Sequence, residues 1–138
     1  MVGSLRYICN SRPDIAYGVG LIRRFMENPK QSHLLVMKRV LRYLKGTIGY
    51  GILYPTNLDC SKSTLTEFSD ADWCGDKSDR KSTTWYLFHL DNAPMSWCSK
   101  KQDVVALSSC EVEYIAASMR ACQAVWLDTL MDELKLKT

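Results

Sequence analysis

The sequence has 138 residues, of which 46% are hydrophobic and 24% are charged, so it can build one compact domain or one and a half small ones. Its charge is uneven: residues 1–54 hold nine Lys or Arg against two acids, a net charge of +7, whereas residues 55–138 hold nine against thirteen, a net charge of −4. No apolar run reaches membrane-spanning length, and residues 1–20 lack the unbroken apolar stretch of a signal peptide. We therefore expect no membrane partner and identify no cleavable export signal.

The spacing of the cysteines excludes two common kinds of site. They form no C-x-x-C pair and have no cluster of histidines beside them, which argues against a zinc site and against a dithiol redox motif. We predict buried thiols, and disulfides remain the alternative if the chain is secreted. The six cysteines are Cys9, Cys60, Cys74, Cys98, Cys110 and Cys122.

Two helices are predicted in the first part of the chain. The first opens at residues 13–14 (Pro-Asp), keeps apolar residues at roughly helical spacing, and ends at residues 28–29 (Asn-Pro). The Asn-Pro pair can also cap the second helix, which runs to about Lys45 before the stop signal of Gly46. Together they predict a helical hairpin.

The second predicted helix is amphipathic and strongly basic. Lys38, Arg42 and Lys45 recur at positions i, i+4 and i+7, with Arg39 beside them, opposite a stripe of apolar residues. Such a face suits weak binding of nucleic-acid phosphates, and it equally suits a charged surface that is only solvated. Both interpretations stay open at this point.

A turn-rich stretch separates this helical segment from a part with strand character. Residues 55–63 are predicted to be a linker between a helical segment at 1–54 and a second domain at 64–138. The second domain begins with three β-forming runs joined by short links, which predict an antiparallel meander. The predicted strands are residues 65–69, 83–90 and 94–99.

A long helix is predicted after the meander. Ser108 and Glu111 have the spacing of a capping box at its start. The predicted fold class is therefore α+β. The apolar stripe predicted for this helix consists of Ile115, Met119, Cys122, Trp126 and Leu130.

Long stretches of the sequence resemble one protein family. The ribonuclease H domain at the end of copia-type retroelement polyproteins is similar to FSDADWCGDKSDRKSTTWYLF (68–88), MSWCSKKQDVVALSSCEVEYIAAS (95–118) and CQAVWL (122–127). Residues 2–29 and 38–54 are similar to the segment that joins reverse transcriptase to that domain. Several long motifs in the right order make the resemblance specific. It implies an incomplete ribonuclease H-like fold behind the helical hairpin.

The resemblance also implies a chemistry, the cleavage of RNA in RNA–DNA hybrids by two magnesium ions held between carboxylates. It maps the first-strand carboxylate onto Asp70 and the first-helix carboxylate onto Glu113, with Asp72 ranked behind Asp70. The family's fourth strand, which carries a third carboxylate, has no counterpart in the sequence. We therefore expect a vestigial site, no nuclease activity and no cofactor, with magnesium bound only if the site were completed.

Two further expectations follow from the resemblance. The family's fourth strand pairs with its first, so strand 65–69 is expected to have an open edge through which the chain can self-associate or accept another strand. Four basic residues match family positions that can touch a hybrid backbone, with plain surface solvation as the alternative. They are Arg80, Lys81, Lys100 and Lys101.

A second resemblance concerns the four residues Arg39, Val40, Leu41 and Arg42, which spell R-x-L-R. This string names a class of secreted effectors of oomycete plant pathogens, and the whole chain resembles a short effector of that type. The resemblance implies suppression of plant cell death and immunity, with an unknown host protein as partner and the host nucleus or cytoplasm as destination. The string is short, and Leu41 is also expected for helix packing.

These observations lead to one interpretation with one alternative. The favoured stand-alone role is a non-enzymatic, retroelement-derived protein that acts as a secreted effector of the R-x-L-R type. The alternative is a ribonuclease H whose site is completed by residues outside this sequence.

Overall fold

The chain is described here by a computed structural model that covers residues 1–56 and 64–136. It divides into two compact units, Met1–Leu53 and Tyr54–Thr138. Most of the predicted linker, residues 57–63, lies outside the described residues, as does Cys60. Among the helices described, none has the length and apolar content needed to cross a membrane.

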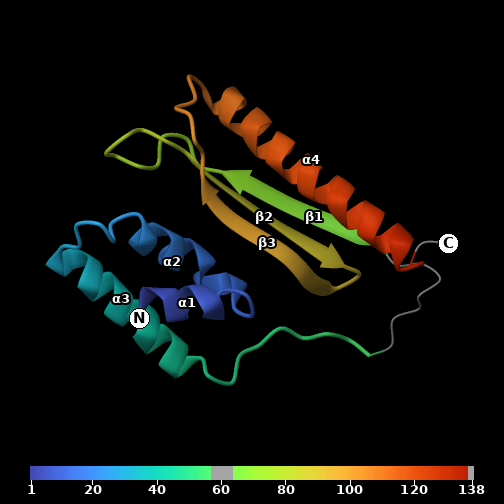
Figure 1. Cartoon of the computed structure of the whole chain (residues 1–138), viewed down its shortest axis with the longest axis horizontal. Helices are drawn as coiled ribbons and strands as arrows, with labels where there is room; N and C mark the ends of the chain where they lie inside the picture. The colour runs from blue at the N-terminus through green and yellow to red at the C-terminus, as the bar shows by residue number, and fades with distance from the viewer. Residues whose placement is uncertain (57–63, 137–138) are drawn as a thin grey trace. The chain divides into compact units, whose positions relative to one another are not determined.

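Three α-helices and one short 3-10 helix build the first unit (Figure 1). The two predicted helices are present as α2 and α3, but the prediction of a hairpin missed α1. The missed helix is only seven residues long, which is too short for an apolar period to stand out from the sequence. The elements are α1 (Val2–Ile8), η1 (Pro13–Ile15), α2 (Ala16–Arg23) and α3 (Gln31–Gly46).

The core of the first unit draws on every one of these elements. Leu34, Val40 and Leu44 of α3 are partly buried and pack against it, so α3 turns its apolar stripe inward and leaves its opposite face to solvent. Because Leu5 comes from α1, the missed helix is a structural part of the unit and not a loose terminus. The buried core residues are Leu5, Ile15, Val19, Ile22 and Met37.

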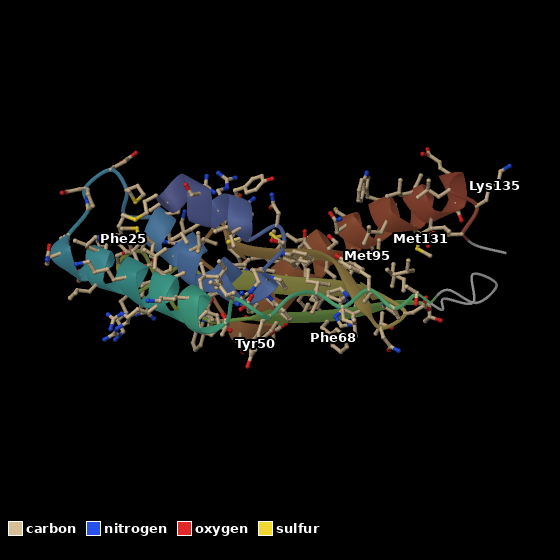
Figure 2. The ribbon with its side chains drawn as sticks, turned by 90° about the horizontal axis from the view of Figure 1, so that it is seen from below. Phe25, Tyr50, Phe68, Met95, Met131 and Lys135 are labelled. Carbon is tan, nitrogen blue, oxygen red and sulfur yellow. The ribbon has the colours of Figure 1, made fainter. Side chains whose placement is uncertain are left out.

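The start of α3 differs from the prediction, because the Asn-Pro pair at 28–29 does not cap it. Lys30 is the capping residue, and its backbone N–H donates to Nδ1 of His33 at 3.0 Å. The imidazole of His33 also stacks on Phe25, with ring centroids 4.3 Å apart; Figure 2 labels Phe25. A side chain of the first turn thus supplies an acceptor at this helix end.

Arg12 ties the start of η1 to the end of α3. Its guanidinium donates to both carboxylate oxygens of Asp14, at 2.9 and 2.7 Å, and to the carbonyl and hydroxyl oxygens of Thr47, at 3.1 and 2.8 Å. The hydrogen bonds from Arg12 hold the pKa of Asp14 below its usual range. Arg12 is only 9% exposed, and its charge is fully paired. Its bonds to Thr47 therefore hold the chain in position where it leaves α3.

The second unit is a three-stranded antiparallel sheet with a long helix on one face (Figure 1). The strand order is β1-β2-β3, so the predicted meander and the α+β class are confirmed. Within the described residues β1 pairs with β2 alone, which leaves its other edge open, as expected. The elements are β1 (Leu65–Ala71), β2 (Thr83–Leu90), β3 (Ala93–Lys101) and α4 (Ser109–Glu133).

The predicted cap of α4 is confirmed. Ser108 Oγ accepts the backbone N–H of Glu111 at 3.2 Å. The carboxylate of Glu111 in turn accepts the N–H of Leu107 at 2.7 Å, one residue earlier than in a standard capping box. Glu111 is therefore committed to the helix start, as its spacing suggested.

The buried stripe of α4 is not the one that the sequence predicted. Buried side chains recur at Val112, Ala116, Leu127 and Met131, and Arg120 and Gln123 of the same side bond to Ser69 and Ser96 of the sheet. The predicted stripe is half-buried or exposed, with Trp126 57% exposed. Both sides of α4 carry apolar residues at helical spacing, so the period alone does not select the buried side. Figure 2 labels Met131 near the end of the helix.

The prediction of buried thiols is wrong for two cysteines of α4. Cys110 and Cys122 are exposed, whereas Cys9, Cys74 and Cys98 are partly buried. None of these five described cysteines forms a disulfide. The error at Cys122 has the same cause as the misplaced stripe, because the prediction turned this side of α4 inward.

Neighbouring residues of α4 allow a direct test of its buried side. Leu127→Ala should lower the free energy of unfolding by about 2–5 kcal/mol because it empties a packed position, whereas Trp126→Ala should cost less than about 1 kcal/mol. Chemical denaturation of both variants measures the difference. A larger cost for the tryptophan variant would show that α4 packs through the predicted stripe instead.

Candidate functional site

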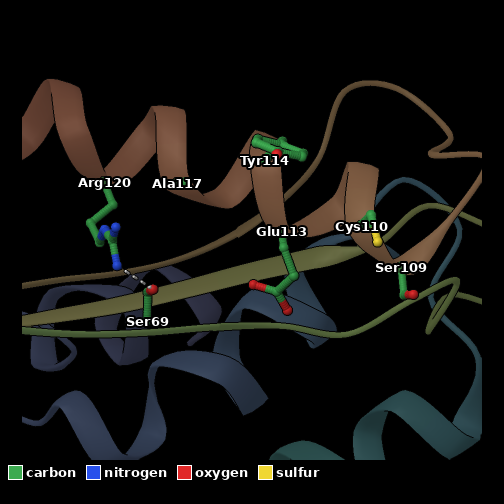
Figure 3. A pocket seen from close by; sticks show the side chains of 7 residues that line it. All are labelled: Ser69, Ser109, Cys110, Glu113, Tyr114, Ala117 and Arg120. Carbon is green, nitrogen blue, oxygen red and sulfur yellow. Dashed lines mark hydrogen bonds between the residues drawn. The ribbon is translucent and has the colours of Figure 1, made fainter.

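A cavity of about 440 Å³ lies between β1 and the first half of α4 (Figure 3). One acid, Glu113, and one base, Arg120, face it together with small and polar side chains. The cavity lies beside the two elements to which the sequence assigned the catalytic carboxylates. Its lining consists of Ser69, Ser109, Cys110, Glu113, Tyr114, Ala117 and Arg120.

Arg120 anchors α4 on β1 at one end of this cavity. Its Nη1 donates to Ser69 Oγ at 3.2 Å, a bond drawn in Figure 3, and its Nε lies 3.4 Å from Glu67 Oε1. Glu67 and Ser69 are two residues apart and so project from the same face of the strand. This contact fixes the position of α4 on β1, and it pairs the one cation of the cavity lining with a carboxylate of the strand.

The two predicted catalytic carboxylates do not meet in the cavity. Figure 3 shows Glu113 directed from α4 toward β1. Asp70 does not line the cavity, because alternation along β1 directs it to the face opposite that of Ser69. Its Oδ1 instead accepts the N–H of Ala71 at 2.9 Å.

This arrangement does not fit the pair of magnesium ions that the ribonuclease H resemblance implies. Hard divalent cations of this type are held by oxygen ligands that converge on one point. Glu113 shares its cavity with the Arg120 guanidinium and not with Asp70. Across residues 1–56 and 64–136, no three His, Cys, Asp or Glu side chains are grouped so that they could hold a metal ion.

Asp72, ranked behind Asp70 by the sequence, shapes the connection between β1 and β2. Its Oδ1 accepts the backbone N–H of the buried Thr83. A Cβ atom at Gly75 would overlap Asp72 Oδ2, so a larger residue at that position would have to displace the carboxylate. The residue therefore holds the loop in place.

An ion cluster that the sequence did not predict closes the same loop. The ammonium of Lys101 bonds to Asp76 and, at 2.7 Å, to Asp79. The hydrogen bonds from Lys101 and Ser78 lower the pKa of Asp76 well below the usual carboxyl range. Burial opposes the charge of Lys101, but its hydrogen bonds to both carboxylates raise its pKa above the ordinary lysine value.

The basic residues assigned to nucleic-acid contacts lie in different surroundings. Lys38, Arg42 and Lys45 are exposed on α3. Nucleic-acid binding by any of these residues stays a prediction. In the second unit Arg80 is exposed at a left-handed φ of 60°, Lys81 is half-buried, Lys100 lies 3.6 Å from Asp103, and Lys101 is held in the ion cluster.

The R-x-L-R string lies inside α3 as a folded helix and not as an extended peptide. Arg39 and Arg42 are exposed, and Leu41 is 38% exposed. Val40, between them, packs against the core of the first unit. Both arginines of the string thus belong to the basic face of the helix.

Comparisons with known proteins identify relatives that cover nearly the whole chain. No family model matches the chain, and no solved structure matches it. It is 42% identical, over 99% of its length, to the Retrovirus-related Pol polyprotein from transposon RE1 of Arabidopsis thaliana, and 44% identical, over 98%, to that from transposon TNT 1-94 of Nicotiana tabacum. It spans 9% and 10% of those two proteins. Over 91% of its length it is 46% identical to Secreted RxLR effector protein 161 of Plasmopara viticola, of which it covers 87%.

A unit that joins an antiparallel meander to one long helix has the α+β class that the sequence predicted. The chain belongs to the family of retrovirus-related Pol polyprotein sequences of copia-type transposons. The family inferred from the sequence motifs is thereby confirmed.

Lys100 and Lys101 offer a matched test of the ion cluster. Lys101→Met should lower the unfolding temperature at pH 7, whereas Lys100→Met should leave it nearly unchanged because Lys100 is exposed and has one long contact. The pKa of Asp76 is lowered by folding, so the stability it contributes is present above the ordinary carboxyl pKa of about 4 and is lost as the pH falls below that value. The difference in unfolding temperature between wild type and Lys101→Met should therefore become smaller in acid. A difference that stays constant from pH 7 to pH 2 would contradict the assignment of Asp76 and Lys101 to a stabilising ion cluster.

Proposed function

We propose that the chain is a non-enzymatic protein of retroelement origin, which keeps ribonuclease H-like elements without their chemistry. One observation carries this proposal: the cavity between β1 and α4 receives Glu113 and the Arg120 guanidinium but not Asp70. Hydrolysis by this family's route needs its carboxylates and metal ions within a few tenths of an ångström of a productive geometry. Glu113 is the one acid among the residues that line the cavity, so a cation there would have a single carboxylate ligand, fewer than such a site needs.

The neighbouring acids support the same conclusion, because each has a structural partner. Glu67 is paired with Arg120, Asp72 accepts a backbone N–H of β2, and Glu111 accepts a backbone N–H at the start of α4. Moving any of them to a metal would leave a donor without its acceptor, which costs about 1–3 kcal/mol when the donor is buried. These three acids therefore stabilise the fold.

The test is cleavage of a labelled RNA–DNA hybrid by the purified chain with magnesium. Wild type and the double variant Asp70→Asn, Glu113→Gln should both release no product above the protein-free background, while an authentic ribonuclease H cuts the same hybrid in the same buffer. Cleavage by wild type that the double variant lacks would overturn the proposal and assign ribonuclease H activity, the alternative that the sequence left open. Circular dichroism of both proteins serves as the folding control.

A second candidate function rests on the similarity to the Plasmopara viticola protein, whose name calls it a secreted RxLR effector. We propose that this chain is likewise an effector, and that it suppresses plant cell death from inside the host cell. The similarity covers most of that protein, unlike the tenth of each Pol polyprotein. Arg39 and Arg42 are exposed, so a partner can reach them on the folded helix.

Expression inside plant leaf cells together with a cell-death elicitor tests this candidate without requiring export. Wild type should reduce cell death, and Leu127→Ala, which weakens the second unit, should reduce it less at equal protein level. The control for α3 is Arg39→Gln, Arg42→Gln, which should act like wild type if the string serves only for delivery. Normal cell death in the presence of well-expressed wild type would remove the effector candidate.

A further inference from the structure

Backbone groups of alternate β1 residues are directed to the open edge of this strand. Two hydrogen bonds at its ends fix which ones. The carbonyl of Thr64 accepts the N–H of Asp91 at 2.8 Å, and at the other end the N–H of Asp72 donates to the carbonyl of Thr83 at 3.2 Å. Backbone groups alternate between the two sides of a strand, so the even-numbered residues face β2. The residues whose N–H and C=O groups face the open edge are Leu65, Glu67, Ser69 and Ala71.

One end of this edge is already closed by a side chain. The N–H of Ala71 donates to Asp70 Oδ1 at 2.9 Å, so it is not available to another strand. The part of the edge that can still pair runs from Leu65 to Ser69, or about 17 Å of extended chain. An added strand of about five residues matches this length.

The cavity beside α4 lies on the same open side of β1. Ser69 lines it, but Tyr86, which is opposite Ser69 on β2, does not. Side chains directly opposite each other on neighbouring strands share a face of the sheet. A strand added at the open edge would therefore direct the residue opposite Ser69 into the cavity, whose volume of about 440 Å³ is of ligand-binding size. We call the open edge of residues 65–69 together with this cavity the β1 groove.

The charge of the β1 groove favours a basic side chain. Glu113 is exposed at the cavity, and within the described residues it takes part in no ion pair. The base of the cavity lining, Arg120, is already paired with Glu67. A lysine or arginine in the cavity would meet an unpaired carboxylate, whereas an acid there would meet a like charge.

The face of the sheet away from α4 sets a second preference. Phe68 belongs to this face, is 50% exposed, and touches His89 edge-on with ring centroids 5.5 Å apart. A residue opposite Phe68 in an added strand would cover the exposed ring, and pairs of aromatic and β-branched side chains stabilise sheets in this position. The groove therefore favours an extended segment in which a basic residue stands next to a β-branched or aromatic one.

These preferences distinguish a foreign segment from a second copy of β1. The strand contains two acids, Glu67 and Asp70, and no base, so pairing two copies edge to edge would add acid to an acidic groove. We propose that the β1 groove binds an extended basic segment of another protein as an added strand, with a lysine or arginine directed at Glu113. Main-chain hydrogen bonds supply affinity in this mode, and the cavity supplies specificity. The inference does not depend on either proposed function.

The experiment is fluorescence anisotropy of a fluorescein-labelled peptide, Thr-Val-Lys-Val-Thr, titrated with the full chain. Its side chains have the same order in both directions, so the test covers parallel and antiparallel pairing. One control peptide has glutamate in place of lysine, and a second has N-methylated backbone amides that cannot donate hydrogen bonds. The test variant is Glu113→Gln. Its matched control is Glu133→Gln, which removes the same charge from an exposed position at the end of α4.

The expected result depends on both the lysine and the peptide backbone. Wild type should bind the lysine peptide with a Kd below about 1 mM. Glu113→Gln should weaken this binding by at least about threefold, and Glu133→Gln should leave it nearly unchanged. The glutamate peptide and the N-methylated peptide should each bind at least about tenfold more weakly than the lysine peptide.

Amide hydrogen exchange gives a second measurement of strand addition. Binding of the lysine peptide should slow the exchange of the N–H groups of Glu67 and Ser69, which face the open edge. The N–H groups of Thr66 and Phe68 face β2 and should change little. Circular dichroism checks that both variants are folded.

Three outcomes would overturn the inference. Equal losses in Glu113→Gln and Glu133→Gln would mean that net charge alone attracts the peptide. Equal binding of the N-methylated peptide would mean that no strand is added. No binding of the lysine peptide below about 1 mM, or unchanged exchange at the open edge, would show that the groove takes no such segment. Cleavage of an RNA–DNA hybrid and suppression of cell death are measured separately, so failure of either proposed function is distinguishable from failure of this inference.

Discussion

The contact between α4 and β1 is the interaction on which the second unit depends. Three strands expose two faces, and a sheet of this size needs a helix on at least one of them to exclude water from its apolar side chains. α4 fulfils this role with a continuous side from Val112 to Met131, and Arg120 fixes its position against Glu67 and Ser69. The cavity, its charge and the position of Glu113 all follow from this docking.

The connection between β1 and β2 shows why an acid-rich region is not automatically a metal site. A carboxylate can bind a cation only if it is not already needed by a backbone N–H or a guanidinium, and the order of these demands is set by burial. Asp72 satisfies a donor of the buried Thr83, and Asp76 is held by Lys101. In both cases the acid matters to the fold through bonds that the sequence motif does not display.

Much of this architecture could be predicted from the sequence because its signals are local. The β-forming residues of β2 are bounded by turn residues, and its predicted limits agree with the observed strand. The cap at Ser108 depends on two residues three positions apart, so spacing alone identified it. Family motifs located both carboxylates on the elements that flank the cavity.

The features that were missed depend on contacts between distant residues. The buried side of α4 is decided by which residues the sheet offers, and Leu127 and Trp126 are adjacent in a helix with apolar residues on both sides. Lys101 meets Asp76 across 25 positions of sequence, and the direction of Asp70 depends on the face that Ser69 presents to α4. α1 was missed because it is stabilised by the core that Leu5 enters and not by its own helical period.

The helical state of the R-x-L-R string has a consequence for any receptor that reads such strings as extended peptides. Val40 packs with the core of the first unit, so straightening these four residues removes a packed side chain and unwinds the middle of α3. Such a receptor binds only the small fraction of molecules in which the helix has opened, and its apparent affinity is reduced by that fraction. A mutation that weakens the core far from the string would then strengthen recognition, and a ligand that holds α3 folded would compete with the receptor without touching its binding site.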